Sequence, residues 1–230
     1  MTCVDLRPFG FQCDVEAHGA VVDSWSGGSR LVFLIGENHK DREMKRLNLQ
    51  DACSLCNLGI LACVGVEEAM EDAIRWDREK IDRWSRELFD YHKTDDGVIA
   101  YLSQHQPSWY GLFEFGKTLK LLRPSLDVRC VEDPGLREQM KPIASSYELW
   151  GLGAAPHPSP EHPKMGDHPH NFLREEAMIA NLFKLWEEPR EAGAALLNTG
   201  LDHCRRLAER LQAQGINYIY LLNPTNPIAF

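Results

Sequence analysis

The stretch Leu31–Asp41, LVFLIGENHKD, decides the fold. Five apolar residues, Leu31–Ile35, run without a break into Gly36, and a continuous apolar run this short is typical of a strand buried on both faces in a parallel sheet. Polar residues follow at once, with Glu37 and His39 at an i, i+2 spacing that directs both side chains to one side of an extended chain. Ligands of open α/β sheets bind outside the carboxyl ends of the strands. The stretch therefore predicts a central strand that ends in candidate functional residues; a plain polar loop is the alternative.

Further apolar runs end in the same way, in segments that carry acid or histidine. Ala62–Val66 leads into Glu67 and Glu68, Leu126–Val131 leads into Glu132, and Ala194–Leu197 leads into a glycine turn before His203. Segments with helical spacing of their apolar residues separate these runs, and a last strand is expected at 217–222. This alternation predicts an α/β fold: an open, mostly parallel sheet of about five strands with helices on both faces. A short edge strand is also expected at 20–23.

The strand ends supply the candidate catalytic residues. Carboxyl ends of neighbouring parallel strands share one edge of the sheet, so side chains that are far apart in sequence converge there. We therefore expect Glu37, His39, Glu67 and His203 to line one cleft. His203 lies in the first turn of a helix, whose dipole opposes an imidazolium. The sequence thus predicts a neutral His203 that is suited to act as a base or a metal ligand.

A fifth candidate is an arginine. The segment 171–188 is predicted to be an amphipathic helix with Arg174 in its first turn. The helix dipole favours an acid rather than a cation at this position. Arg174 is therefore expected to face an anionic site, and pairing with a neighbouring glutamate on the surface is the alternative.

Four further residues are candidates for binding the substrate. Glu68 and Glu132 belong to the acidic strand ends, although Glu68 is also suited simply to begin the next helix. Trp109 and Tyr110 follow a break in the helical pattern. The aromatic residues of 109–115 are either part of the core or the wall of a ligand site.

Composition points to a globular protein without a nucleic-acid partner. The 230 residues suffice for one α/β domain over 1–230, and a net charge of −9 without a basic stripe argues against binding nucleic acid. No apolar run is long enough to cross a membrane, and the N-terminus lacks the features of a signal peptide, so we expect a cytoplasmic protein. Seven cysteines without a framework spacing fit that expectation.

One segment departs from this composition. Residues 151–170 contain five prolines and four histidines, with few apolar anchors. We expect a mobile loop that acts at most as a lid. Its histidines are candidate metal ligands, but proline-rich loops seldom hold a closed site. Cys53 and Cys56 form a C-x-x-C pair without the second pair that a structural zinc site requires.

In order and spacing, these motifs resemble the superfamily that includes erythromycin esterases, Tiki/TraB proteins and ChaN-type haem-binding proteins. LIGENHKD is similar to the family's G-E-x-H, CVGVEEA to its strand-end glutamate, NFLREEAMIANL to its arginine-bearing helix and LNTGLDHC to its G-x-x-H. VRCVEDP is similar to a third acidic strand end in Tiki-like members. Members of the superfamily hydrolyse esters, hydrolyse peptides or bind haem. The resemblance implies an open α/β sheet with one cleft and a working set of Glu37, His39, Glu67, Arg174 and His203.

The residue types favour a hydrolase. A histidine held by a carboxylate can activate water as a general base, a second carboxylate can act as an acid or electrostatic partner, and an arginine can stabilise the oxyanion. No G-x-S-x-G elbow is present, so attack by water is favoured over a covalent intermediate. We expect a small-molecule or peptide substrate. The oligomeric state and the cofactor stay open: a divalent metal held by the Glu/His set, lyase or cyclase chemistry, and a haem-binding module are the alternatives.

Overall fold

The computed structural model describes residues 1–28, 30–67, 78–106, 113–159, 161, 164–187 and 193–223. The strands are β1 (Thr2–Asp5), β2 (Asp14–Ala17), β3 (Ala20–Trp25), β4 (Leu31–Glu37), β5 (Leu61–Val66), β6 (Asp127–Cys130), β7 (Ala194–Gly200) and β8 (Asn217–Leu222). The α-helices are α1 (Arg42–Asn57), α3 (Arg78–His92), α4 (Asp95–His105), α5 (Phe115–Leu122), α6 (Pro134–Gly151), α7 (Pro169–Glu187) and α8 (Leu201–Ala213). Short 3-10 turns lie at Arg7–Phe9 and Met165–Asp167.

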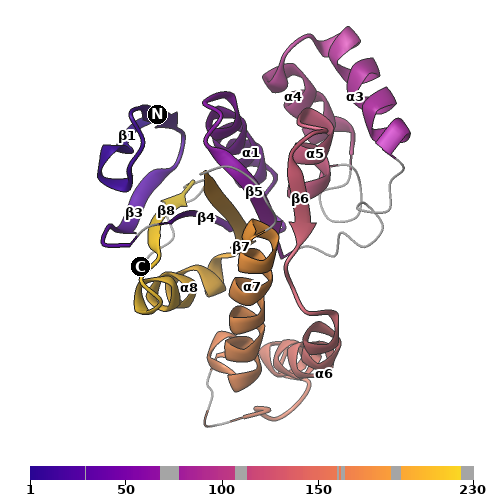
Figure 1. Ribbon diagram of the computed structural model, residues 1–230. Helices are drawn as coiled ribbons and strands as arrows, with labels where there is room; N and C mark the ends of the chain where they lie inside the picture. Colours follow the sequence, from indigo (N-terminus) through magenta and orange to yellow (C-terminus); the bar gives the residue numbers. More distant parts are fainter. Residues whose placement is uncertain are drawn as a thin grey trace.

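A six-stranded sheet in the order β3-β8-β4-β7-β5-β6 forms the centre of the protein (Figure 1). β4 pairs in parallel with β7 and β8, and β5 pairs in parallel with β6 and β7. The edge strand β3 is antiparallel to β8. The predicted α/β fold with a mostly parallel sheet is therefore confirmed, and the expected edge strand is the sixth strand. The antiparallel β1–β2 hairpin is an addition that the weak patterning of residues 1–30 does not predict.

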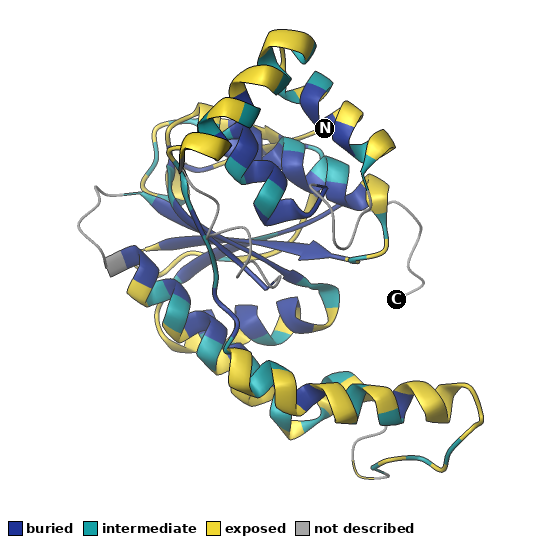
Figure 2. Ribbon diagram, turned by 90° about the vertical axis from the view of Figure 1, so that its right-hand side faces the viewer, coloured by how far each residue is buried: buried dark blue, intermediate teal, exposed yellow. Residues whose placement is uncertain are grey.

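Helices cover both faces of the six-stranded sheet (Figure 2). Successive strand residues point to opposite faces, so the two sides of β4 enter different cores. Phe33 and Ile35 pack with residues of α1, α4 and α5, whereas Val32 and Leu34 pack with residues of α7 and α8. Every residue of β4 is buried, which explains its continuous apolar run. The carboxyl end of β4 consequently lies in the middle of the sheet edge, between the two helix layers.

Helices α1 and α7 carry residues of the candidate site. Asp41 caps α1 by accepting a hydrogen bond from the Met44 N–H at 2.9 Å, so only a short connection separates β4 from α1. α7 begins at Pro169, two residues earlier than the sequence indicates, and Arg174 therefore lies in its second turn. α6 and the start of α7 project beyond the sheet (Figures 1 and 2).

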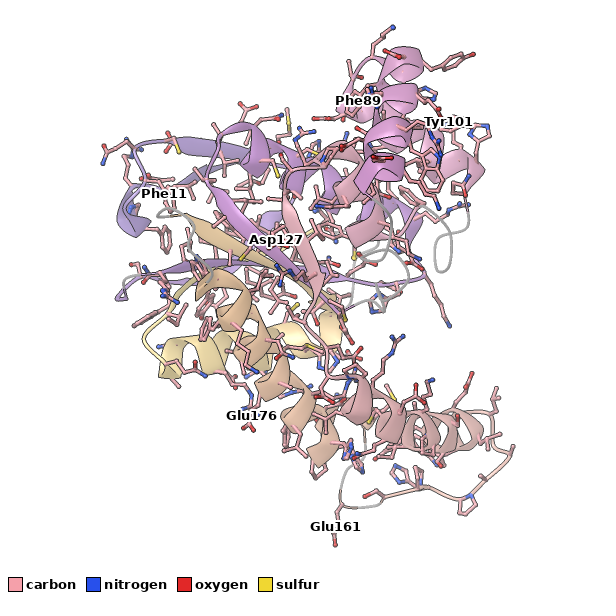
Figure 3. The ribbon with its side chains drawn as sticks, turned by 45° about the vertical axis from the view of Figure 1, so that its right-hand side comes forward. Phe11, Phe89, Tyr101, Asp127, Glu161 and Glu176 are labelled. Atoms are coloured by element: carbon pink, nitrogen blue, oxygen red, sulfur yellow. The ribbon has the colours of Figure 1, made fainter. Side chains whose placement is uncertain are left out.

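The α3–α4 pair lies at the opposite end of the molecule from α6 and the start of α7. Figure 3 shows Phe89 and Tyr101 of that pair far from Glu161, which precedes α7. Within the described ranges, every helix is too short or too polar to span a bilayer. The mobility of the segment 151–170 and the single-domain organisation stay predictions.

Candidate functional site

The carboxyl end of β4 holds a buried carboxylate between a lysine and a histidine. Oε1 of the buried Glu37 lies 3.2 Å from His39 Nδ1 and 3.2 Å from Lys45 Nζ. Burial alone would raise the pKa of Glu37, but the hydrogen bond from His39 and the charge of Lys45 outweigh burial and lower the pKa. An ionised carboxylate only accepts hydrogen bonds, so a neutral His39 carries its proton on Nδ1 and Nε2 is its basic nitrogen.

The carboxyl ends of β5 and β7 hold a second carboxylate, that of Glu67. Its Oε2 accepts hydrogen bonds from the Thr199 hydroxyl at 2.7 Å and from the Gly200 N–H at 2.6 Å. Its Oε1 lies 2.9 Å from Arg174 Nη2 and 3.4 Å from His203 Nε2. Burial would raise the pKa of Glu67, but the hydrogen bond and charge of His203 hold that pKa far below its usual range. Glu67 is therefore an anion with both oxygens engaged.

Arg174 connects the ends of β5 and β6. Its Nη2 donates to Glu67, and its Nε donates to Glu132 Oε1 at 2.7 Å. Asn171, one turn earlier on α7, accepts a hydrogen bond from Nη1 at 3.0 Å. The pKa of Glu132 is raised, because its burial and the negative charge of Glu67 outweigh the attraction of Arg174. Arg174 thus pairs with buried strand-end glutamates and not with a glutamate on the surface.

His203 lies between two carboxylates. Its Nδ1 is 2.7 Å from Glu175 Oε1, and its Nε2 faces Glu67. Burial alone would lower the pKa of His203, yet the hydrogen bonds to these two partners raise the pKa to about 9. His203 is therefore an imidazolium at neutral pH, and the expectation of a neutral histidine here is wrong. Two carboxylates in contact with the ring outweigh the dipole of α8.

Glu175 is buried, although its neighbour Glu176 is exposed. Figure 3 shows Glu176 pointing away from α7, and it pairs with Arg210. Glu175 instead accepts hydrogen bonds from His203 Nδ1 and from Arg206 Nε, the latter at 2.8 Å. Burial would raise the pKa of Glu175, but these hydrogen bonds lower it. Glu175 therefore fixes the ring of His203 and contributes to its charge.

The two halves of the cluster meet at His39. Its Nε2 lies 4.0 Å from Glu67 Oε2. A Cβ placed on Gly200 would lie 3.5 Å from His39 Nε2 and 3.7 Å from His203 Cδ2, and 3.3 Å from the same Glu67 oxygen. The His39 side chain is 44 % exposed, whereas at most 11 % of each of the side chains around it is exposed. His39 is thus the member of the cluster that meets solvent.

The five residues predicted to be catalytic lie in one cluster, and Glu132 joins it through Arg174. That the cluster lines a cleft stays a prediction. Three candidate substrate-binding residues fall outside the described part of the chain: Glu68, Trp109 and Tyr110. Phe113 and Phe115, from the same aromatic segment, belong to the core.

Sequence reasoning missed Lys45, Glu175 and Thr199. The first two lie at helical spacing from other buried residues: Glu175 lies between Asn171 and Ile179 on α7, and Lys45 precedes Asn48 and Leu49 on α1. A charged residue on an otherwise buried stripe is the signal that could have identified both. Thr199 directly precedes the glycine turn and gives no signal of its own.

The described residues do not form a metal site. No group of three or more His, Cys, Asp or Glu side chains among them is placed to hold a metal ion. The carboxylates of Glu37 and Glu67 are paired with protein cations instead. In the C-x-x-C pair of α1, burial raises the pKa of both thiols, that of Cys56 to about 11, which disfavours thiolate chemistry.

Comparisons with protein-family models, curated proteins and solved structures give no match for this chain. What the protein does must therefore be inferred from the geometry of the cluster and from the motifs that build it.

Proposed function

We propose that this chain is a hydrolase in which His39 activates water to cleave an ester or amide bond. The supporting observation is the placement of His39: it is partly exposed, held at Nδ1 by an ionised carboxylate, and adjacent through Nε2 to a carboxylate that carries two cations. A general base, a group that orients it and cations that stabilise a developing oxyanion are the parts that such a reaction requires.

His39 is the general base of the proposed reaction. A water molecule gives its proton to His39 Nε2 while its oxygen attacks the carbonyl carbon of the substrate. Glu37 keeps its hydrogen bond to Nδ1 and stabilises the imidazolium that forms 3.2 Å away. The proposed reaction therefore needs no serine or cysteine nucleophile.

Arg174 and His203 act on the negative charge that develops on the substrate. Arg174 Nη2 and His203 Nε2 lie 2.9 and 3.4 Å from the same oxygen of Glu67, Oε1. Glu67 therefore holds the two cations side by side. In the proposed reaction they stabilise the oxyanion, and the charged His203 gives a proton to the leaving group. Glu67 balances their charge when no substrate is bound.

The motifs support the same reaction class, because they resemble a superfamily with esterases and peptidases among its members. The superfamily also includes haem-binding proteins. The described residues of the aromatic segment, Phe113 and Phe115, are core residues and favour no haem site. A small-molecule or peptide substrate and a cytoplasmic location remain our expectation.

Hydrolysis of p-nitrophenyl acetate and of a short peptide p-nitroanilide tests the proposal. The variants are His39→Gln, His203→Gln and the matched control His18→Gln, whose Nδ1 also faces a buried carboxylate, Asp51, at 3.1 Å. We expect His39→Gln to lower kcat by at least about a hundredfold and His203→Gln by a similar factor, because each removes a proton-transfer group.

His18→Gln should hydrolyse both substrates like the wild type. Melting temperatures of all three variants identify any loss that comes from unfolding. Undiminished turnover in His39→Gln would remove the assignment of the base, and failure of the wild type on both substrates would contradict the hydrolase proposal.

A further inference from the structure

Lys45 is a buried cation on α1, whose other buried residues are apolar except for Asn48 and Asp51. Its side chain is 1 % exposed, and its Nζ lies 3.2 Å from Oε1 of the buried Glu37. Lysine is almost never fully buried unless it is paired. A buried ion pair is seldom more stabilising than apolar side chains of similar volume, because both charges lose their hydration. Stability alone therefore does not explain why this position of α1 carries a charge.

The ion pair continues into His39. Glu37 Oε1 faces both Lys45 and His39 Nδ1, whereas Glu37 Oε2 has no hydrogen-bond partner among the described residues. A buried carboxylate with a bare oxygen holds its negative charge only if a cation lies close by. The charge of Glu37 thus depends on Lys45 together with the hydrogen bond from His39, and that charge in turn places the His39 proton on Nδ1.

We propose that Lys45 is a positioning residue that, through Glu37, keeps Nε2 of His39 unprotonated at neutral pH. The use of that nitrogen as a base rests on the proposed hydrolase function, whereas the effect of Lys45 on the Glu37–His39 pair does not. Glu37 and His39 share protons as a coupled pair. A cation beside the pair weakens its hold on a proton, whichever of the two residues carries it. Without Lys45 the pair keeps a proton to higher pH, and the unprotonated base is lost.

Other charged groups also face the pair. Glu67 of β5 lies 4.0 Å from His39 Nε2 and favours protonation of the ring. Arg174 of α7 and His203 of α8 contact Glu67 and oppose that effect. All three groups are the same in wild-type protein and in a Lys45→Met variant. A difference between the two proteins therefore reports the cation on α1.

Lys45→Met keeps the length of the side chain and removes its charge. Imidazole 15N resonances of His39, assigned by their absence in His39→Gln, report the apparent pKa and the tautomer of the ring during a pH titration. We expect the apparent pKa of the pair to rise by at least about one unit. At pH values below that pKa, kcat/KM for p-nitrophenyl acetate should fall about tenfold for each pH unit. An unchanged titration in folded Lys45→Met protein overturns the proposal, whether or not the protein cleaves the ester.

A second comparison keeps the proposal testable if Lys45→Met does not fold. Glu37→Gln and Glu37→Gln/Lys45→Met differ only at Lys45, and the double variant lacks both buried charges. The Lys45 charge also repels a proton on the His39 ring directly, so the two His39 titrations should differ slightly. If Lys45 acts mainly through Glu37, they differ by less than about half a unit, and ester hydrolysis stays within about threefold. A titration shift of a unit, or a further tenfold loss of hydrolysis in the double variant, overturns the proposal, because Lys45 would then act independently of Glu37.

Discussion

Helix α1 borders two histidine–carboxylate pairs that are alike in geometry. His39 Nδ1 lies 3.2 Å from Glu37, and His18 Nδ1 lies 3.1 Å from Asp51. Both carboxylates are fully buried, and the histidine side chains are 44 % and 30 % exposed. Distance and burial alone therefore do not distinguish a candidate catalytic pair from a structural one.

The two pairs differ in the other partners of the carboxylate. Asp51 also accepts hydrogen bonds from the backbone N–H groups of His18 and Gly19, at 2.6 and 3.1 Å, and from the Asn223 amide at 2.9 Å. These contacts hold the start of β3 and the end of β8 against α1. Glu37 has a lysine cation at one oxygen and no partner for the other among the described residues. Asp51, with hydrogen bonds at both oxygens, stabilises the fold. Glu37 is stabilised mainly by neighbouring charge, so its interactions change when His39 gains or loses a proton.

The ionic character of the strand-end cluster predicts a pH-dependent stability. Below pH 6.5 His203 is protonated in both the folded and the unfolded chain, so its attraction to the buried carboxylates is fully present. Above pH 6.5 the unfolded chain loses this proton, while the folded protein keeps it up to about pH 9. The free energy of unfolding should therefore fall by up to about 3 kcal/mol across this window. Urea unfolding at several pH values measures this fall, and His203→Gln should abolish it. If the free energy of unfolding had the same slope against pH in both proteins, the ionic description of His203 would be wrong.

Replacing each carboxylate with an amide should show which pair serves stability and which serves hydrolysis. Asp51→Asn turns an NH2 group toward backbone donors and should lower the free energy of unfolding by about 2 kcal/mol. Ester hydrolysis per folded molecule should not change. Glu37→Gln/Lys45→Met removes a whole ion pair and should change stability by less than about 1 kcal/mol while lowering kcat. Unfolding curves and kcat measured on the same samples test both expectations. Lost turnover with unchanged stability in Asp51→Asn would show that Asp51, and not Glu37, serves hydrolysis.

Two glycines offer the smallest and most closely matched change. The backbone N–H of each donates to a buried carboxylate. A Cβ on Gly200 would enter the space between His39 and His203, so Gly200→Ala should lower kcat/KM about tenfold by displacing the reacting groups. A Cβ on Gly19 would lie 3.3 Å from Asp51 Oδ2, so Gly19→Ala should change Tm and leave turnover as it is. Equal turnover in both variants would show that no reaction takes place beside Gly200.

The sheet could be predicted because its central strands are buried on both faces. Leu31–Ile35 and Ala194–Leu197 are continuous apolar runs, and parallel pairing brings their polar ends to one edge. The same rule explains why residues as distant as Glu37 and His203 fall into one cluster. The β1–β2 hairpin escapes prediction because its short strands, TCVD and DVEA, are half exposed or more and contain too few apolar residues to establish a pattern.

The electrostatics of the cluster could not be predicted from local sequence. Adjacent Glu175 and Glu176 are chemically identical. The helical spacing of α7 distinguishes the buried position from the exposed one, but it does not give the partners that Glu175 meets on α8, His203 and Arg206. The charge of His203 depends on Glu175, which lies 28 positions earlier in the chain. The helix dipole, which can be inferred from sequence, is a weaker influence than a carboxylate in contact. The sequence can therefore identify members of the cluster, but their protonation states can be assigned only from the structure.

The cluster straddles the sheet, with Lys45 and Glu37 on the α1 face and Arg174, Glu175 and His203 on the α7–α8 face. Neither helix layer completes it alone. A folding intermediate with one docked layer would bury charges that still lack their partners, which is unfavourable. The two layers therefore gain from docking in one cooperative step. Recovery of turnover during refolding should coincide with this joint docking, so that activity reports complete assembly and not the earlier collapse of the chain.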